Sequence, residues 1–164
     1  MEDWLVDEAL ISAPFGGVRL TVRQERQGLG KPALEIVLLP NPVHTKTPHS
    51  ILLSQLAEHV ICYLQQPQYV IPLLVTPSGT ALQQRVWEAI LNIPVRHTCS
   101  YTDIALQLGS HPRVIANACG ANPLPLMIPC HRVLSKHGLG GFMRSAPRSL
   151  EIKRWLLHHE QSTS

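Results

Sequence analysis

Proline restricts this chain more than any other residue type, because fourteen prolines are spread along its 164 positions. A proline fixes its own φ and lacks a backbone N–H, so it is favoured in turns and at helix starts and disfavoured in helix interiors. Pro40, Pro94 and Pro112 each border an apolar segment that has the periodicity of a strand or a helix. The distribution predicts short elements joined by rigid turns rather than a few long helices.

Composition narrows the class of molecule. Hydrophobic residues make up 45% of the chain and charged residues 15%, which favours a compact globule over a disordered chain. The length suits one domain or two small ones. No segment has the basic start and apolar core of a signal peptide, and no apolar run is long enough to cross a bilayer. We therefore expect no membrane association and a monomeric protein.

The four cysteines, Cys62, Cys99, Cys119 and Cys130, form no C-x-x-C pair and no cluster with the spacing of a zinc site. We expect free thiols in a reducing compartment, with no metal and no cofactor. The predicted location is the cytoplasm, or the nucleus if the source is eukaryotic.

The first half has the pattern of a small α/β unit. Val18–Val22 alternates apolar and polar residues, and Ala33–Leu39 is a second predicted strand that ends at Pro40. Residues 50–65 show helical spacing, with Ser50 placed as the N-cap. Because nothing in this half offers a catalytic constellation, we interpret residues 1–78 as an N-terminal α/β domain that supports the fold.

The second half, residues 79–164, predicts a mostly helical domain that contains a helix-turn-helix. Thr80 is placed to cap a helix that stops near Asn92. A capping box at Ser100 and Asp103 then begins a helix that ends at Gly109. After a short turn, residues 113–119 form a second helix, and this outline is typical of DNA-binding units. A last helix is predicted from Ser145 and Pro147 to Glu160. The fold class is therefore α/β (α+β).

Charge is unevenly distributed between the two halves. Residues 1–79 carry 5 Lys and Arg against 7 Asp and Glu, whereas residues 80–164 carry 9 against 4. A basic half is the electrostatic signature of binding to a phosphate backbone. Asn117 is the one side chain of the second helix suited to base edges, which favours contact with the DNA backbone or the minor groove.

The strongest candidate for chemistry is Cys130, in the sequence Ile128-Pro129-Cys130-His131-Arg132-Val133. An uncharged run, 121–129, precedes it and predicts buried backbone that leads to an exposed turn. A thiol attacks as thiolate, and a neighbouring base or cation favours that form. The alternative is a buried structural cysteine beside two basic residues, since free cysteine is often buried.

An ordered series of residues now points to a family. In this series the sequence resembles the O6-alkylguanine-DNA alkyltransferases, also called methylated-DNA–protein-cysteine methyltransferases, closely over residues 79–160 and more loosely before them. The residues that carry the resemblance are Gly79-Thr80, Val86-Trp87, Ile93-Pro94, Ser100-Tyr101, Asn122-Pro123, Ile128 to Val133, Lys153, Leu156-Leu157 and Glu160, with Ala13 to Val18 in the first half.

The resemblance implies a suicide reaction on double-stranded DNA that contains O6-alkylguanine, and also O4-alkylthymine. The damaged base is flipped out of the duplex, because its exocyclic oxygen cannot be reached inside the stack. Cys130 then takes the alkyl group irreversibly. His131 is implied as the base, through a water, and Glu160 as the residue that orients it.

The resemblance also implies roles in binding. Tyr101 corresponds to the residue that crowds the phosphate and donates a hydrogen bond to the base, and Arg113 to the arginine that enters the stack. Ser100, Asn117 and Arg132 are further predicted DNA contacts. Asn122 corresponds to a hinge, Pro125 to an apolar pocket wall, and Phe142 with Met143 to a loop that forms another wall.

Three departures from the family pattern concern the surroundings of Cys130. The segment from Tyr101 to Arg113 is shorter than usual, and the residues that follow Arg113 are less small than usual. Phe142 stands where tyrosine is common, Met143 and Arg144 replace small residues, and extra residues precede Lys153. Two other functions therefore stay open: an alkyltransferase-like protein that binds the lesion without efficient transfer, and a thiol hydrolase.

Overall fold

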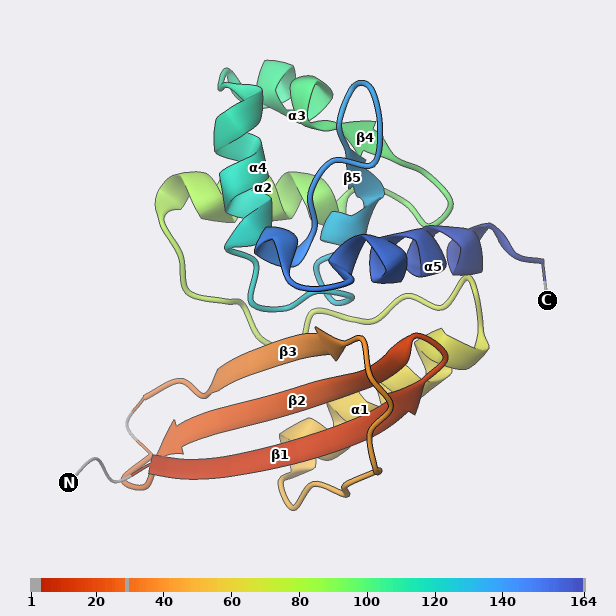
Figure 1. The fold of residues 1–164 in the computed structure, drawn as a ribbon. Helices are drawn as coiled ribbons and strands as arrows, with labels where there is room; N and C mark the ends of the chain where they lie inside the picture. Colours follow the sequence, from red (N-terminus) through yellow and green to blue (C-terminus); the bar gives the residue numbers. More distant parts are fainter. Residues whose placement is uncertain (1–3, 29, 164) are drawn as a thin grey trace.

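The computed structural model describes residues 4–28 and 30–163, and its first part is a three-stranded antiparallel sheet (Figure 1). The strands are β1 (Trp4–Ala13), β2 (Gly16–Glu25) and β3 (Ala33–Leu39), hydrogen-bonded in the order β1-β2-β3. The strands predicted at 18–22 and 33–39 are confirmed within β2 and as β3. β1 has no counterpart among the predictions, so the sheet is wider than expected.

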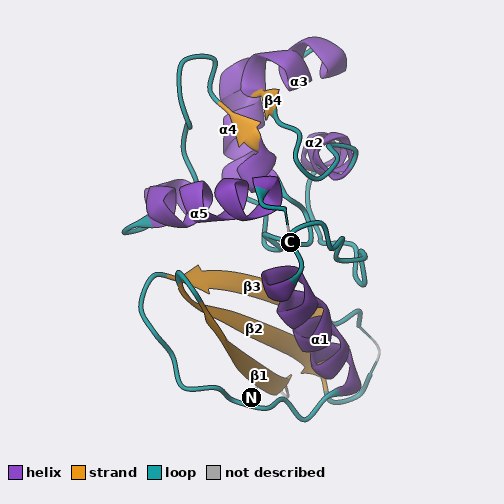
Figure 2. Cartoon of the chain, turned by 90° about the vertical axis from the view of Figure 1, so that its right-hand side faces the viewer, coloured by secondary structure: helices purple, strands orange, loops and turns teal. Residues whose placement is uncertain are grey.

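One face of this sheet forms the core of the first half. Alternate residues of the three strands are buried, and the register places them side by side: Ala9 is opposite Leu20, and Leu20 is opposite Ile36. Helix α1 (Ile51–Gln65) covers this face (Figure 2). Each fully buried leucine, such as Leu20, stabilises the fold by about 1.5–3 kcal/mol relative to an exposed one.

Helix α1 begins where the sequence predicts. The Ser50 side chain accepts a hydrogen bond from the Leu53 N–H at 3.3 Å. The face that packs on the sheet consists of Leu53, Leu56, Ala57, Val60 and Tyr63, whereas Ile51 and Ile61 are exposed. The last residue of that buried face, Tyr63, faces the second half of the chain.

Helix α2 (Ala81–Leu91) opens the second half. Thr80 and Gln83 form a complete capping box at its start, and Asn92 is its C-cap, as predicted. The indole N–H of Trp87 donates to the Ala118 carbonyl at 2.9 Å and so attaches α2 to a later helix. The boundary between domains at 78 and 79 stays a prediction.

The predicted helix-turn-helix is present as α3 (Tyr101–Leu108) and α4 (Pro112–Gly120). Ser100 and Asp103 form the capping box of α3, and Gly109 ends it in the left-handed conformation with φ 64°. Proline at the first position of α4 suits a helix start. The two-residue strand β4 (Cys99–Ser100) pairs in parallel with β5 (Val133–Leu134), which ties α3 to the segment around Cys130.

The last helix, α5 (Ser149–Gln161), begins later than predicted. Met143, Arg144 and Ser145 all have positive φ, between 51° and 59°, and form a short turn that cannot continue into a right-handed helix. In both views α5 lies between the sheet and the helix-turn-helix (Figures 1 and 2). In the described part of the chain, no helix has the length and apolar character needed to cross a membrane.

Candidate active site

Cys130 occupies the first position of a 3-10 turn, Cys130–Arg132, that follows the uncharged run. Asn122 holds the run in a tight bend, because its side-chain amide donates to the Ile128 carbonyl and its oxygen accepts from the Leu124 N–H, both at 2.9 Å. The predicted exposed turn is wrong, since only 7% of Cys130 is accessible. The apolar residues 124–129 are themselves buried and draw the turn into the core.

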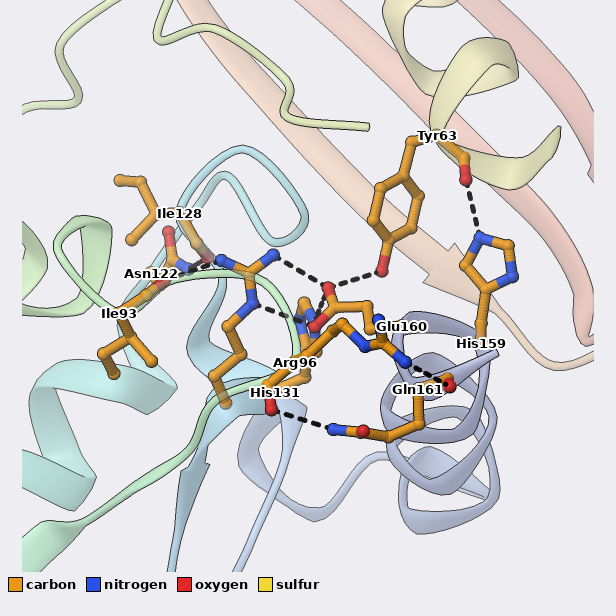
Figure 3. A network of polar contacts seen from close by, with 10 residues as sticks. Tyr63, Ile93, Arg96, Asn122, Ile128, His131, His159, Glu160 and Gln161 are labelled. Carbon is orange, nitrogen blue, oxygen red and sulfur yellow. Dashed lines mark hydrogen bonds and ion pairs between the residues drawn. The ribbon is translucent and has the colours of Figure 1, made fainter. Parts of the chain in front are cut away.

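His131, the residue after Cys130, belongs to a buried polar network with Arg132, Glu160 and Tyr63 (Figure 3). His131 lies 2.6 Å through Nε2 from Glu160 Oε1. Arg132 donates from Nε to Oε2 and from Nη2 to Oε1 of Glu160, each at 2.9 Å, and from Nη1 to the Ile93 carbonyl at 2.8 Å. The Tyr63 hydroxyl donates to Glu160 Oε1 at 2.9 Å. All four side chains are buried.

The network fixes the protonation of His131. Burial raises the pKa of Glu160, but hydrogen bonds from His131 and Arg132 outweigh it and hold that pKa at about 2, so the group is a carboxylate. Burial lowers the pKa of His131 below its ordinary value, although Glu160 opposes this. A neutral His131 must then carry its proton on Nε2 to donate to Glu160. Its Nδ1 is an acceptor, buried and without a hydrogen-bond partner in the structure.

The thiol itself is shielded. Burial raises the pKa of Cys130, whereas a hydrogen bond from Asn122 and the charge of Lys153 act in the opposite direction. The resting group is therefore a thiol, which needs a base to become a thiolate. Lys153 donates to the carbonyls of Val133, Leu139 and Gly141 at 2.6–2.9 Å. Burial lowers its pKa to about 8.

A cavity of about 440 Å³ opens in front of Cys130. It lies between α4 and the turn at Met143–Ser145, and its lining residues are Tyr101, Ala116, Asn117, Cys119, Gly120, Cys130, Gly141, Phe142, Met143, Arg144 and Ser145. Of the predicted pocket residues, Phe142 and Met143 lie on this wall. Pro125 is buried elsewhere and does not line the cavity, which disagrees with its predicted role. Asn122 shapes the bend behind it.

The predicted DNA contacts fall into two groups. Arg113 and Asn117 are exposed on α4, and Tyr101 and Ser100 are half-buried at the start of α3. Arg132, in contrast, is enclosed by its bonds to Glu160 and Ile93, so its placement disagrees with a DNA contact. The guanidinium neutralises the buried carboxylate instead.

Tyr101 joins the helix-turn-helix to the cavity. Its hydroxyl donates to the Gly141 carbonyl at 3.3 Å, and burial raises its pKa to about 12, so it remains a hydrogen-bond donor at neutral pH. Gly140 packs against the ring: a Cβ at this position would lie 2.7 Å from the tyrosine.

Sequence reasoning missed Tyr63 and Lys153 as members of the site. Tyr63 continues the helical spacing of Leu56 and Val60, which marks it as a core residue but gives no sign of its hydroxyl contact. Lys153 is part of the series of motif residues, and its position among apolar neighbours of α5 was the available signal. Among the described residues, no group of three or more His, Cys, Asp or Glu could hold a metal ion.

The fold and site define a class of protein in which a helix-turn-helix is attached to a buried cysteine backed by a histidine–carboxylate pair. The model of the 6-O-methylguanine DNA methyltransferase DNA-binding domain matches residues 81–162. The constitutive methylated-DNA–protein-cysteine methyltransferase of Bacillus subtilis is 35% identical over 124 residues, which cover 74% of this chain and 72% of that protein. The chain belongs to this methyltransferase family.

Solved structures agree with this assignment. The crystal structure of the Mycobacterium tuberculosis O6-methylguanine methyltransferase has a TM-score of 0.73 and 30% identity, and the match covers 98% of this chain and 95% of that one. A structure of the M. tuberculosis protein in complex with DNA has a TM-score of 0.68 and 29% identity over 94% of this chain and 92% of that one. The chain spans 57%, 43% and 35% of the length of three other relatives, from mimivirus, Salmonella typhimurium and Escherichia coli.

Proposed function

We propose that this protein repairs DNA by transferring the alkyl group of O6-alkylguanine, and of O4-alkylthymine, irreversibly to Cys130. The proposal is carried by one observation: the buried His131–Glu160 pair immediately follows, in the 3-10 turn, a cysteine that opens on a cavity beside the helix-turn-helix. The same kinds of group, a nucleophile, a base and a residue that orients the base, serve thiol chemistry generally. Family membership supports the reaction class.

The base in this scheme is Nδ1 of His131. Glu160 holds the proton of the ring on Nε2, so the lone pair of Nδ1 is free to take the Cys130 proton, directly or through a water. Because the thiol is protonated at rest, it is protected from unspecific electrophiles until a substrate fills the cavity. Lys153 favours the thiolate once it forms.

The transfer step is balanced in atoms and electrons. The Cys130 sulfur forms a bond to the alkyl carbon as the bond between that carbon and O6 breaks. The electron pair moves into the guanine ring, which gains the proton that the thiol lost. The Tyr101 hydroxyl, which donates to the Gly141 carbonyl in this structure, turns to donate to the base and so stabilises the developing negative charge. The thioether product is stable, so each molecule acts once.

The base reaches the cavity by flipping out of the duplex. Arg113 is exposed at the start of α4, where it enters the stack from the minor groove and fills the vacated space. Asn117 and Ser100 contact the strand beside it. The excess of basic residues in the second half strengthens binding to the phosphate backbone. The protein acts as a monomer in a compartment that holds DNA and keeps thiols reduced, the cytoplasm or nucleus.

One observation favours a second candidate, a protein that binds alkylated DNA without efficient transfer. Arg144 projects from the turn at Met143–Ser145 into the wall of the cavity and donates from Nε to the Gly120 carbonyl at 2.9 Å. A large side chain at this place narrows the space available to an alkyl group. A thiol hydrolase, the third possibility, has no observation in its favour beyond the cysteine and histidine.

A stoichiometric assay separates the three functions. Duplex DNA that carries O6-methylguanine is incubated with a limiting amount of protein, and the remaining lesion is counted after digestion to nucleosides. Alkyl transfer to the protein removes one lesion per molecule and then stops. A binding protein removes none although it retains the duplex. A hydrolytic enzyme removes more lesions than there are protein molecules.

A further inference from the structure

Tyr63 brings the first half of the chain into contact with the site. It lies at the end of the buried face of α1, 97 residues before Glu160, and only 1% of it is accessible. Its hydroxyl donates to Glu160 Oε1 at 2.9 Å (Figure 3). Among the described residues before 79, no other side chain is hydrogen-bonded to this carboxylate.

The oxygen that Tyr63 contacts is the one that orients the base. Glu160 Oε1 lies 2.6 Å from His131 Nε2 and 2.9 Å from Arg132 Nη2, so three donors converge on a single atom. Burial, followed by the charge of Glu160, raises the pKa of the Tyr63 phenol well above its ordinary value. Tyr63 therefore remains a hydrogen-bond donor at neutral pH.

A second contact holds Tyr63 itself in place. His159, the residue before Glu160, donates from Nε2 to the Tyr63 backbone carbonyl at 2.6 Å (Figure 3). The His159 ring stacks on Trp155 with ring centroids 4.7 Å apart, and Phe15 packs edge-on against Trp155 at 5.2 Å. Tyr63 is thus held at its backbone carbonyl by His159 and at its hydroxyl by Glu160, the next residue of α5.

We propose that Tyr63 is a positioning residue for the Cys130 reaction: it fixes Glu160 Oε1 and thereby sets the orientation and basicity of His131. The first half of the chain then supports the fold and also tunes the base. This inference rests on the proposed function only in assigning His131 as the base.

Removing the Tyr63 hydroxyl should change the pKa of His131 in a definite direction. With one donor fewer, Oε1 accepts more strongly from His131 Nε2, which stabilises the protonated ring and raises the pKa of His131. The other charged groups that act on His131 are Glu160 itself, Arg132 and Lys153, and Tyr63→Phe changes the charge of none of them. The base is then protonated at a higher pH, so the reaction slows first on the acid side.

The test compares full-length wild type with Tyr63→Phe and Tyr69→Phe. Tyr69→Phe is the matched control, because it removes a hydroxyl from the same half of the chain. That hydroxyl contacts His59, at 2.6 Å, and does not contact the site. Two quantities are measured from pH 5 to 8: the rate at which iodoacetamide modifies Cys130, mapped by mass spectrometry, and the NMR titration of the His131 ring.

We expect Tyr63→Phe to raise the pKa of the acid limb and of the His131 ring, and to slow modification about three- to tenfold at pH 6, the size of one hydrogen bond. Tyr69→Phe should match wild type. Incorporating 3-fluorotyrosine at position 63, a stronger donor of similar shape, should shift the limb the opposite way. Identical profiles for Tyr63→Phe and Tyr69→Phe, or shifts in one direction for both Tyr63 replacements, overturn the inference.

The readouts separate this inference from the proposed function. Both are recorded without DNA, and wild type is assayed in parallel for loss of O6-methylguanine. A wild type that removes no lesion contradicts the proposed function, while a shifted His131 titration in Tyr63→Phe still supports the inference. The reverse pattern, repair by wild type with an unshifted His131 titration in Tyr63→Phe, contradicts only the role of Tyr63.

Discussion

Glu160 is the residue on which the buried network depends. Its carboxylate accepts from Tyr63, His131 and Arg132, and Arg132 would otherwise be an unpaired guanidinium in the core. Breaking one partner of a buried pair costs more than the pair itself contributes, because the remaining charge has lost its compensation. Stability and the orientation of the proposed base therefore depend on the same side chain.

Replacing Glu160 by Gln should lower the free energy of unfolding by about 3–5 kcal/mol at pH 6, because Arg132 loses its counter-charge. The pKa of Glu160 is lowered in the folded state, from 4.5 to about 2. Its contribution, on the order of 3 kcal/mol, is complete above pH 4.5 and is lost as pH falls towards 2. Urea unfolding of wild type and Glu160→Gln should give curves that converge in acid.

Glu151→Gln serves as the control, since the pair of Glu151 with Arg148 is more than half exposed, at 59% and 54% of the two side chains. It should change stability by no more than about 0.5 kcal/mol. If Glu160→Gln is no more harmful than this control, or if the gap to wild type widens as pH falls, the proposed electrostatics of the site are incorrect.

At this scale the sequence predicts which residues meet at the site better than it predicts their contacts. Cys130, His131 and Glu160 follow from the motif series, and the structure brings His131 and Glu160 together beside Cys130. The role of Arg132 was not predictable, because a basic residue beside a DNA-binding motif is most simply assigned to DNA. Its burial depends on a carboxylate 28 positions later in the chain.

The helix-turn-helix depends on the geometry of its turn. Gly109 ends α3 with φ 64°, and no atom lies within 4 Å of the position where a Cβ would be. Gly109→Ala should therefore destabilise the protein by about 1 kcal/mol through backbone strain alone. Gly138 is equally open and has no positive φ, so Gly138→Ala is the control.

Thermal unfolding of the two variants tests this account of the turn. A melting temperature that falls for Gly109→Ala and stays near wild type for Gly138→Ala is the expected result. Equal melting temperatures would mean that the turn adapts to an alanine, and that its conformation does not limit the positions of α3 and α4.

Arg113, at the start of α4, belongs to the same element. Because its proposed role is to support base flipping, Arg113→Ala should slow repair in duplex DNA about tenfold or more and leave transfer from free O6-benzylguanine nearly unchanged. Single-turnover rates on both substrates check this. Arg23→Ala removes an equal charge from the sheet and should affect neither substrate. Equal losses on the two substrates would contradict the role of Arg113.

Local patterns predict most elements, and their failures have physical causes. The N-cap at Thr80 and the capping box at Ser100 correctly mark the starts of α2 and α3. β1 escapes prediction because its exposed apolar residues, Leu5 and Val6, interrupt the alternation expected of a half-buried strand. The start of α5 is displaced by the left-handed turn at residues 143–145, a conformation that local propensity favours for glycine, asparagine and aspartate, none of which occurs there.

In the whole molecule, α5 lies between two layers: the sheet with α1 is below it, and the helix-turn-helix is above it (Figure 2). Specific hydrogen bonds join the two halves: the Ile36 N–H donates to the Pro123 carbonyl at 2.9 Å, and Arg148 donates to the Pro40 carbonyl at 3.3 Å. Such pairings link residues more than 80 positions apart. The sequence therefore predicts the elements of each half, but it does not predict the contacts between the halves, such as that of Tyr63 with Glu160.

The central claim is that Cys130 accepts the alkyl group, and the mass of its peptide tests this most directly. Reduced, full-length protein is reacted with duplex DNA containing O6-methylguanine, digested and mapped by mass spectrometry. We predict that the Cys130 peptide gains one methylene unit and that the peptide of Cys119, the other thiol of the cavity, gains none. A Cys130 peptide of unchanged mass in protein that binds this duplex, or a methyl group found on Cys119, would contradict the account.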